Sequence, residues 1–223
     1  MFKCDIIFFS SSIKNDGRYI KIFTETPFIY ESIEEYGYHE YDPITCNNLN
    51  NGGDITISIE SQDMFTYPCE SYLIFEGRPT KAAGIAYANA DEVALTYNAI
   101  MHLFSRIEYN LSKLLVDSIS YPSQATTMLV LLKYSDDFSK APVLNQVWYK
   151  DTSTTAAKVD NNGFAVRHAY LIQSLTVKGT FSLRIPLKHI FDFCEDYDKI
   201  VYGLKNSLPC DRKTDDDAVF RLQ

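Results

Sequence analysis

The clearest pattern in the chain is a strict alternation of apolar and polar residues. Ile55, Ile57 and Ile59 share one face of a segment whose intervening residues are Thr and Ser, and this period of two predicts a β-strand with one solvent-facing side. A longer alternation covers 175–185 and stops at a proline, and a compact apolar run over 71–76 lies between two other prolines. We therefore expect β-strands bounded by turn residues to dominate the fold.

Helical spacing is only local. Apolar residues three or four positions apart over 93–104 predict one short helix that leads directly into a strand. A second helix is expected over 124–134, with Met128, Leu129 and Leu132 on one face. Helices of this kind are expected in the connections between strands.

The same patterns predict how the chain is organised. Residues 1–45 show no sustained period and are interpreted as an N-terminal arm with a possible edge strand. Residues 46–223 are expected to form a single jelly-roll domain with a long inserted loop at about 135–163, in which Val147 and Trp148 need cover and form a possible interface. The predicted fold class is all-β, an antiparallel jelly-roll sandwich with short helices in its connections.

Composition supports a folded β-rich domain. The 223 residues are 46% hydrophobic and 14% aromatic, with 16 Tyr and 14 Phe, and such residues favour half-buried pleated surfaces. The predicted barrel core is the set of apolar side chains on the alternating faces and on the first helix: Ile55, Ile57, Ile59, Leu73, Phe75, Ile100, Phe104, Ile107, Tyr109, Leu175, Val177, Phe181, Leu183 and Ile185.

Charge and cysteine usage narrow the class of protein. The net charge of −8 disfavours direct binding to nucleic-acid phosphates. The N-terminal apolar run, residues 6–9, is too short for a secretion signal or a membrane span. Five scattered cysteines without a C-x-x-C pair favour a reducing compartment. We expect a protein that is not secreted and does not bind membranes.

The sequence contains no recognisable catalytic motif. The acidic residues Glu195, Asp196 and Asp198, and the run at 215–217, are interpreted as solvated turns. Neither a nucleophile elbow nor a phosphate-binding glycine loop is present. The histidines stand alone, without metal-ligand spacing: His39, His102, His168 and His189. We therefore predict no catalytic residue, no metal, no cofactor and no enzyme activity.

Four stretches, taken in order, resemble one protein family. They cover 26–43, 54–81, 98–111 and 181–219, and include the phrases SYLIFEG from Ser71 and FCEDY from Phe193. In this order they are similar to the first half of the hexon-like, double-jelly-roll major capsid proteins of Polinton or Maverick elements and adintoviruses, including copies integrated in animal genomes.

The resemblance implies a structural role. In that family two jelly rolls stand side by side and three chains form a capsomer. A structural, capsid-like subunit is therefore expected, located in a virion or otherwise intracellular. Its expected partners are other copies of itself, as a homotrimeric capsomer, or a second jelly-roll domain.

The chain departs from the family in two places. Pro209 is expected to weaken a central strand after residue 204. The sequence ends at Gln223, where the resemblance places a second jelly roll, so a fragment or a shortened copy is expected, with an apolar patch where the partner barrel would pack.

Two alternative functions remain open. One is a carbohydrate- or protein-binding jelly roll in which Tyr30, Tyr36, Tyr38 and Tyr41 form a stacking surface, although the same tyrosines could clamp the arm to the barrel. The other is a cupin-like metalloenzyme, which would require the scattered histidines to converge in space.

Overall fold

The computed structural model describes nine stretches of the chain. They are residues 2–13, 33–44, 53–59, 65–81, 84–133, 148–155, 157–172, 180–213 and 217–221. The backbone alone is described for 2–13, 33–36 and 221.

Two antiparallel sheets make up most of the described fold. In sheet A the neighbouring strands follow the order β2-β1-β4-β8, and β9 pairs with the opposite end of β4 from β8. Its strands are β1 (Phe2–Ile13), β2 (Ile33–Tyr41), β4 (Phe65–Gly77), β8 (Phe181–Pro186) and β9 (Val201–Tyr202). In sheet B the order is β3-β10-β6-β7. Its strands are β3 (Gly53–Ile59), β6 (Phe104–Leu111), β7 (Leu114–Ser120) and β10 (Asn206–Arg212).

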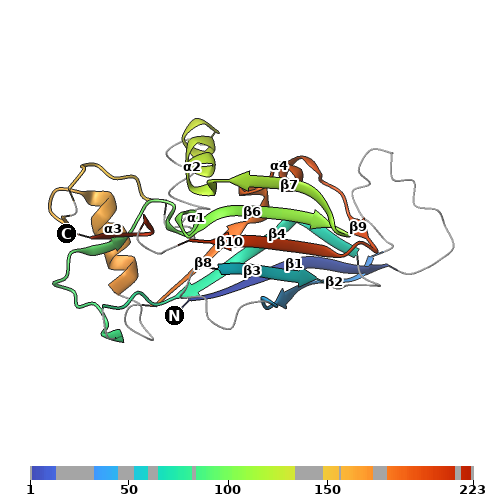
Figure 1. The fold of residues 1–223 in the computed structure, drawn as a ribbon, viewed down its shortest axis with the longest axis horizontal. Helices are drawn as coiled ribbons and strands as arrows, with labels where there is room; N and C mark the ends of the chain where they lie inside the picture. Colours follow the sequence, from blue (N-terminus) through green and yellow to red (C-terminus); the bar gives the residue numbers. More distant parts are fainter. Residues whose placement is uncertain are drawn as a thin grey trace.

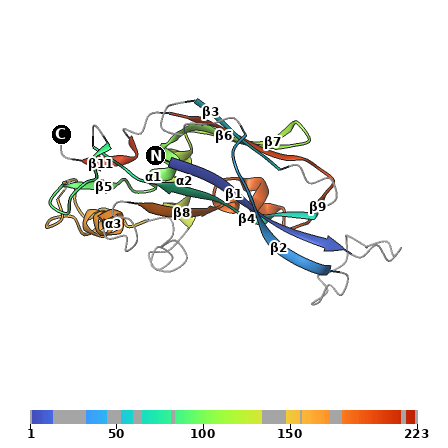
Figure 2. The ribbon, with the colours of Figure 1, turned by 90° about the horizontal axis from the view of Figure 1, so that it is seen from below.

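The two sheets form the layers of a β-sandwich, seen edge-on in Figure 2. A two-stranded ribbon, β5 (Val93–Leu95) with β11 (Val219–Arg221), lies with helix α3 beside one end of the sandwich (Figure 1). The helical elements are α1 (Ala99–His102), α2 (Pro122–Lys133), α3 (Asn162–Ile172), the 3-10 turn η4 (Leu187–His189) and α4 (Asp192–Asp196).

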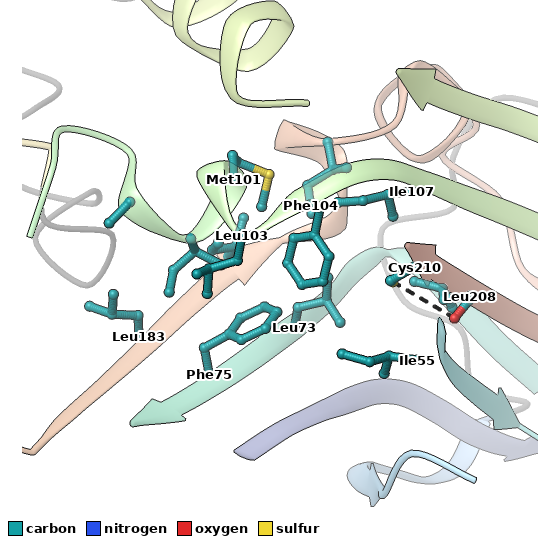
Figure 3. Packing of buried hydrophobic residues seen from close by; sticks show 14 of the residues in the cluster. Ile55, Leu73, Phe75, Met101, Leu103, Phe104, Ile107, Leu183, Leu208 and Cys210 are labelled. Atoms are coloured by element: carbon teal, nitrogen blue, oxygen red, sulfur yellow. Dashed lines mark hydrogen bonds between the residues drawn. The ribbon is translucent and has the colours of Figure 1, made fainter. Parts of the chain in front are cut away.

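The hydrophobic core lies between the two sheets. It is formed by the apolar side chains that alternate with polar ones along the strands. Phe75 of β4 meets Phe104 of β6 with ring centroids 5.5 Å apart (Figure 3). Leu175 and Val177 lie outside the described residues. The other predicted core residues are all buried: Ile55, Ile57, Ile59, Leu73, Phe75, Ile100, Phe104, Ile107, Tyr109, Phe181, Leu183 and Ile185.

The helix expected over 93–104 is much shorter than its apolar spacing indicates. Val93 belongs to strand β5, and Phe104 begins β6. The helix cannot extend backwards because Asn98 has φ 58°, in the left-handed region. The backbone direction therefore changes at Asn98, and only the single turn of α1 remains.

The N-terminal segment is more than an arm. β1 lies inside sheet A, antiparallel to both β2 and β4, so residues 2–13 belong to the sandwich. The expectation of an arm over 1–45 was wrong for this part. The sequence pattern misses β1 because its apolar run is short and polar residues follow at 10–12.

Pro209 lies in an interior strand and interrupts its pairing with one neighbour, as expected from the sequence. β10 pairs with β3 on one side, including Pro209 with Thr56. On the other side it pairs with β6 at Ser207 and Cys210, flanking the proline. A residue without an N–H is tolerated there because hydrogen bonding with β6 continues on both sides of it.

A buried polar contact joins the two sheets. The Tyr109 hydroxyl on β6 donates to Oδ1 of Asn206 on β10 over 2.6 Å. The Asn206 amide donates to Oγ1 of Thr66 on β4 over 3.3 Å, and that hydroxyl donates to the Val201 carbonyl oxygen over 3.2 Å. All four residues are buried, so each group depends on its protein partner for hydrogen bonding.

Replacing Tyr109 with Phe should lower stability, because Oδ1 of buried Asn206 would lose its tyrosine donor. We expect a loss of about 1–3 kcal/mol in the free energy of unfolding, measured by urea denaturation. Tyr202→Phe is the matched control, since Tyr202 is exposed. Equal effects of both variants would contradict a structural role for the buried contact.

Candidate functional site

The acidic cluster predicted to be solvated takes part in local contacts. Glu195 forms an ion pair with Lys133, and Asp198 accepts a hydrogen bond from the Tyr67 hydroxyl. Within the described stretches, no group of three or more His, Cys, Asp or Glu residues is placed to hold a metal ion. The described helices include none long and apolar enough to cross a membrane.

Two buried thiols sit in apolar surroundings. Burial raises the pKa of Cys194 well above its ordinary value and raises the pKa of Cys210 to about 12. Both thiols therefore remain protonated at neutral pH. A protonated thiol is a poor nucleophile, so these two cysteines serve packing.

Trp148 belongs to the interior of its own chain. The side chain is 2% exposed, so the expectation that it forms an interface is wrong. Its indole N–H donates to Oδ1 of Asn98 over 3.2 Å, and its ring stacks on His189 at 6.2 Å between centroids. Val147, its predicted companion, lies outside the described residues.

Asn98 connects Trp148 to helix α2. The Asn98 amide donates to the hydroxyls of Thr126 over 2.8 Å and Thr127 over 3.0 Å. These two threonines thus bind the residue at which the backbone changes direction. The face of α2 that packs on the protein therefore combines these polar contacts with Val130, which packs against Trp148.

A second polar centre, around Arg167, fixes helix α3. The Arg167 side chain is fully buried. Its Nε donates to the Leu95 carbonyl oxygen over 2.7 Å, and its other nitrogens bind the Tyr149 carbonyl oxygen and the Asp151 carboxylate. Pairing with a carboxylate and two carbonyls compensates the cost of burying the guanidinium. Strand β5, helix α3 and the segment after Trp148 are thereby held together.

Asn161 begins helix α3 and organises the preceding segment. Its Oδ1 accepts from the Phe164 N–H over 3.1 Å, which is an N-cap contact. Its amide donates to Oδ1 of Asp151 over 2.8 Å and to the Ser153 carbonyl oxygen over 2.9 Å. The predicted loop at 135–163 therefore ends in a helix cap and the first turn of α3. Asn161 makes hydrogen bonds both to the segment before it and to the first turn of the helix.

The most unusual surface is apolar and follows β7 and α2. It comprises seven exposed side chains, here named the β7–α2 surface: Leu114, Leu115, Val116, Tyr121, Met128, Leu131 and Leu132. Leu114 is 73% exposed and Leu132 is 89% exposed. Figure 1 shows β7 along one rim of sheet B and α2 rising beyond it. The seven side chains form two groups, one at the start of β7 and one at Tyr121 and on α2. Clusters of large exposed apolar side chains are typical of interaction surfaces.

The backbone between β7 and α2 is also unusual. Tyr121 has φ 54° and is exposed, and a bulky residue rarely adopts a positive φ. The Tyr121 N–H donates to the Ser105 carbonyl oxygen over 2.8 Å, which holds this conformation. The strand thus turns directly into the helix with an aromatic side chain at the corner.

The sequence predicted the α2 helix but not its orientation. Met128 and Leu132 are exposed, whereas the buried positions include Ser123, Thr126 and Val130. Helical apolar spacing usually marks the face that packs on the core. Here the packed face is instead fixed by the hydrogen bonds of Asn98 to the threonines and by the contact of Val130 with Trp148.

The tyrosines considered as a stacking surface have different environments. Tyr41 packs against the core. Tyr38 is exposed beside Tyr72, with ring centroids 5.5 Å apart and planes at 50°, and Arg184 lies over the Tyr72 ring. Tyr30 and the side chain of Tyr36 lie outside the described residues.

Comparisons with known proteins add no relative: no family model, curated protein or solved structure matches the chain.

Replacing Gly163 with Ala should destabilise the protein, although Gly→Ala inside a helix is usually favourable. An added Cβ would lie 2.1 Å from the Lys150 carbonyl oxygen, so the segment before α3 would have to move. We expect a loss of about 1–3 kcal/mol in urea denaturation. Gly37→Ala is the control, because nothing lies within 4 Å of its added Cβ. A stabilised Gly163→Ala variant would contradict the close packing.

Stability should fall between about pH 6.5 and pH 4 because His189 is buried. Burial, followed by the charge of Lys188, lowers its pKa from 6.5 to about 4. As the pH falls through this window, the unfolded chain takes up a proton that the folded chain excludes. The largest loss from this group is about 3 kcal/mol.

Urea denaturation at several pH values tests this dependence. The His189→Phe variant keeps an aromatic ring for Trp148 and should show a smaller loss than the wild type. His39→Gln, at an exposed position, should retain the wild-type slope. An unchanged slope in His189→Phe would show that His189 is not responsible.

Proposed function

We propose that this chain is a structural, capsid-like subunit that acts through assembly with other copies. The observation that carries the proposal is the β7–α2 surface, where seven large apolar side chains are exposed on one strand and on the helix that follows it. The sequence resemblance to double-jelly-roll capsid proteins favours the same function.

The strand pairing supports a jelly roll as the scaffold. A jelly roll is a long antiparallel ribbon rolled into two sheets, so its strands pair as nested hairpins. Here β6 pairs with β7, β4 with β8, and β3 with β10, each pair enclosing the previous one along the chain. These successive pairs lie in alternate sheets, as the rolling of one ribbon requires.

The outermost pair is formed by β2 and β1. In a rolled ribbon that starts with β2, the last strand of the ribbon would pair with β2. In this chain β1 occupies the position of that last strand, between β2 and β4. We therefore propose a jelly roll whose final position is filled by the first strand of the chain.

The aromatic face of sheet A gives less support to glycan binding. Sugars stack the C–H bonds of one ring face on exposed aromatic rings, and the 50° between the planes of Tyr38 and Tyr72 prevents these two rings from forming one platform. Arg184 already lies over the Tyr72 ring. The apolar surface therefore favours assembly over carbohydrate recognition.

The purified 223-residue chain should associate as its concentration rises. Light scattering after size exclusion should give a mass above the 25.5 kDa monomer, and negative-stain microscopy should show discrete assemblies. Tyr38→Ala serves as a control outside the apolar surface and should assemble like the wild type. A monomer at every concentration up to the millimolar range would contradict the proposed function.

A further inference from the structure

We infer that the β7–α2 surface binds a second copy of the same chain, with the two β7 strands paired antiparallel about a two-fold axis. The inference rests on the proposed function, which it extends by naming the contact surface and its geometry. Three features of the surface support it: its charge, its free strand edge, and the distribution of its apolar side chains.

Charge favours a second copy over other partners. Between residues 114 and 133 the charged residues are Asp117 and Lys133. Asp117 accepts from the Phe193 N–H over 3.1 Å and Lys133 pairs with Glu195, so both are used inside the subunit. Two chains of net charge −8 repel each other least at a surface of this kind. A membrane surface or a nucleic acid would instead favour exposed Lys and Arg.

The edge of β7 supplies backbone groups for pairing. β7 is the last strand of sheet B, and within the described part of the chain its outer edge has no strand partner. A free edge that carries leucine and valine is a template for another strand. Pairing two identical edges antiparallel satisfies both at once, because a two-fold interface places the same surface on both subunits.

Antiparallel pairing also matches the apolar side chains. Leu114, Leu115 and Val116 lie at the start of β7, whereas α2 follows its end. Reversing the second strand brings the start of one β7 toward the α2 of the other copy, and symmetry forms this contact twice. Figure 1 shows the backbone of α2 beyond the rim of sheet B, so in this arrangement the helix that carries exposed Leu131 and Leu132 lies beside the partner's strand.

Two substitutions that place opposite charges on the β7–α2 surface test this geometry. Leu114→Glu and Leu132→Lys should each raise the apparent Kd for self-association at least about tenfold, as measured by sedimentation equilibrium. Both positions are exposed, so circular dichroism and urea denaturation should match the wild type. Val159→Glu is the control, because Val159 is an apolar residue, 95% exposed, outside the surface.

Mixing the two single variants distinguishes antiparallel pairing from other arrangements. In a mixed dimer, one contact joins Glu at 114 with Lys at 132 of the other copy, and the second contact keeps both leucines. We therefore expect the mixture to associate more tightly than either variant alone. Failure of the mixture to recover association would overturn the antiparallel geometry.

Three other outcomes would overturn the inference. If the wild type assembles and both variants behave like Val159→Glu, the contact surface is wrong but the proposed function stands. If the wild type remains monomeric, both fail. If the wild type instead sediments with phosphatidylcholine–phosphatidylserine vesicles and Leu132→Lys does not, the surface binds a membrane.

Discussion

The packing of two alternating apolar faces is the constraint on which the rest of the structure depends. A period of two places every second side chain of β3, β4, β6 and β8 between the sheets, so a shift of one residue in any strand would expose its core residues. Contacts such as that between Phe75 and Phe104 therefore fix strand register as well as excluding water. The Tyr109–Asn206–Thr66 contact adds a polar requirement to the same interface, because its groups are satisfied only when both sheets are aligned.

Polar side chains then fix segments that the core does not reach. Arg167 binds a strand carbonyl, a loop carbonyl and a carboxylate from a fully buried position. Asn98 similarly connects a left-handed backbone position with α2 and Trp148. Each centre joins segments far apart in sequence, so the regions beside the sandwich are held by hydrogen bonds where apolar contacts are fewer.

The sequence was sufficient to predict the strands whose apolar and polar residues alternate. It was insufficient for segments whose structure is decided by tertiary contacts. Ile55, Leu73 and Ile107 could be placed in the core because burial on one face leaves a period of two. β1 could not be identified, because its place in sheet A is set by pairing with β2 and β4. Asn98 could not be assigned its role, since a single Asn does not indicate its φ or its distant partners. The resemblance predicted an apolar patch where a second jelly roll would pack, but no pattern in the sequence indicated the exposed apolar side chains of β7 and α2.

The orientation of α2 would keep the stability of the fold separate from the association that we propose. If the helix packed by its leucines, any residue that favoured association would also be needed for folding. Instead, Thr126 and Thr127 attach α2 to Asn98 through hydrogen bonds. The Leu132 side chain is almost fully exposed to solvent. Burying that side chain against a second subunit would yield free energy that the isolated fold does not use. Attachment of α2 through the contacts of Asn98 and through Val130 thus leaves the apolar side chains of its other face exposed, as the proposed assembly requires.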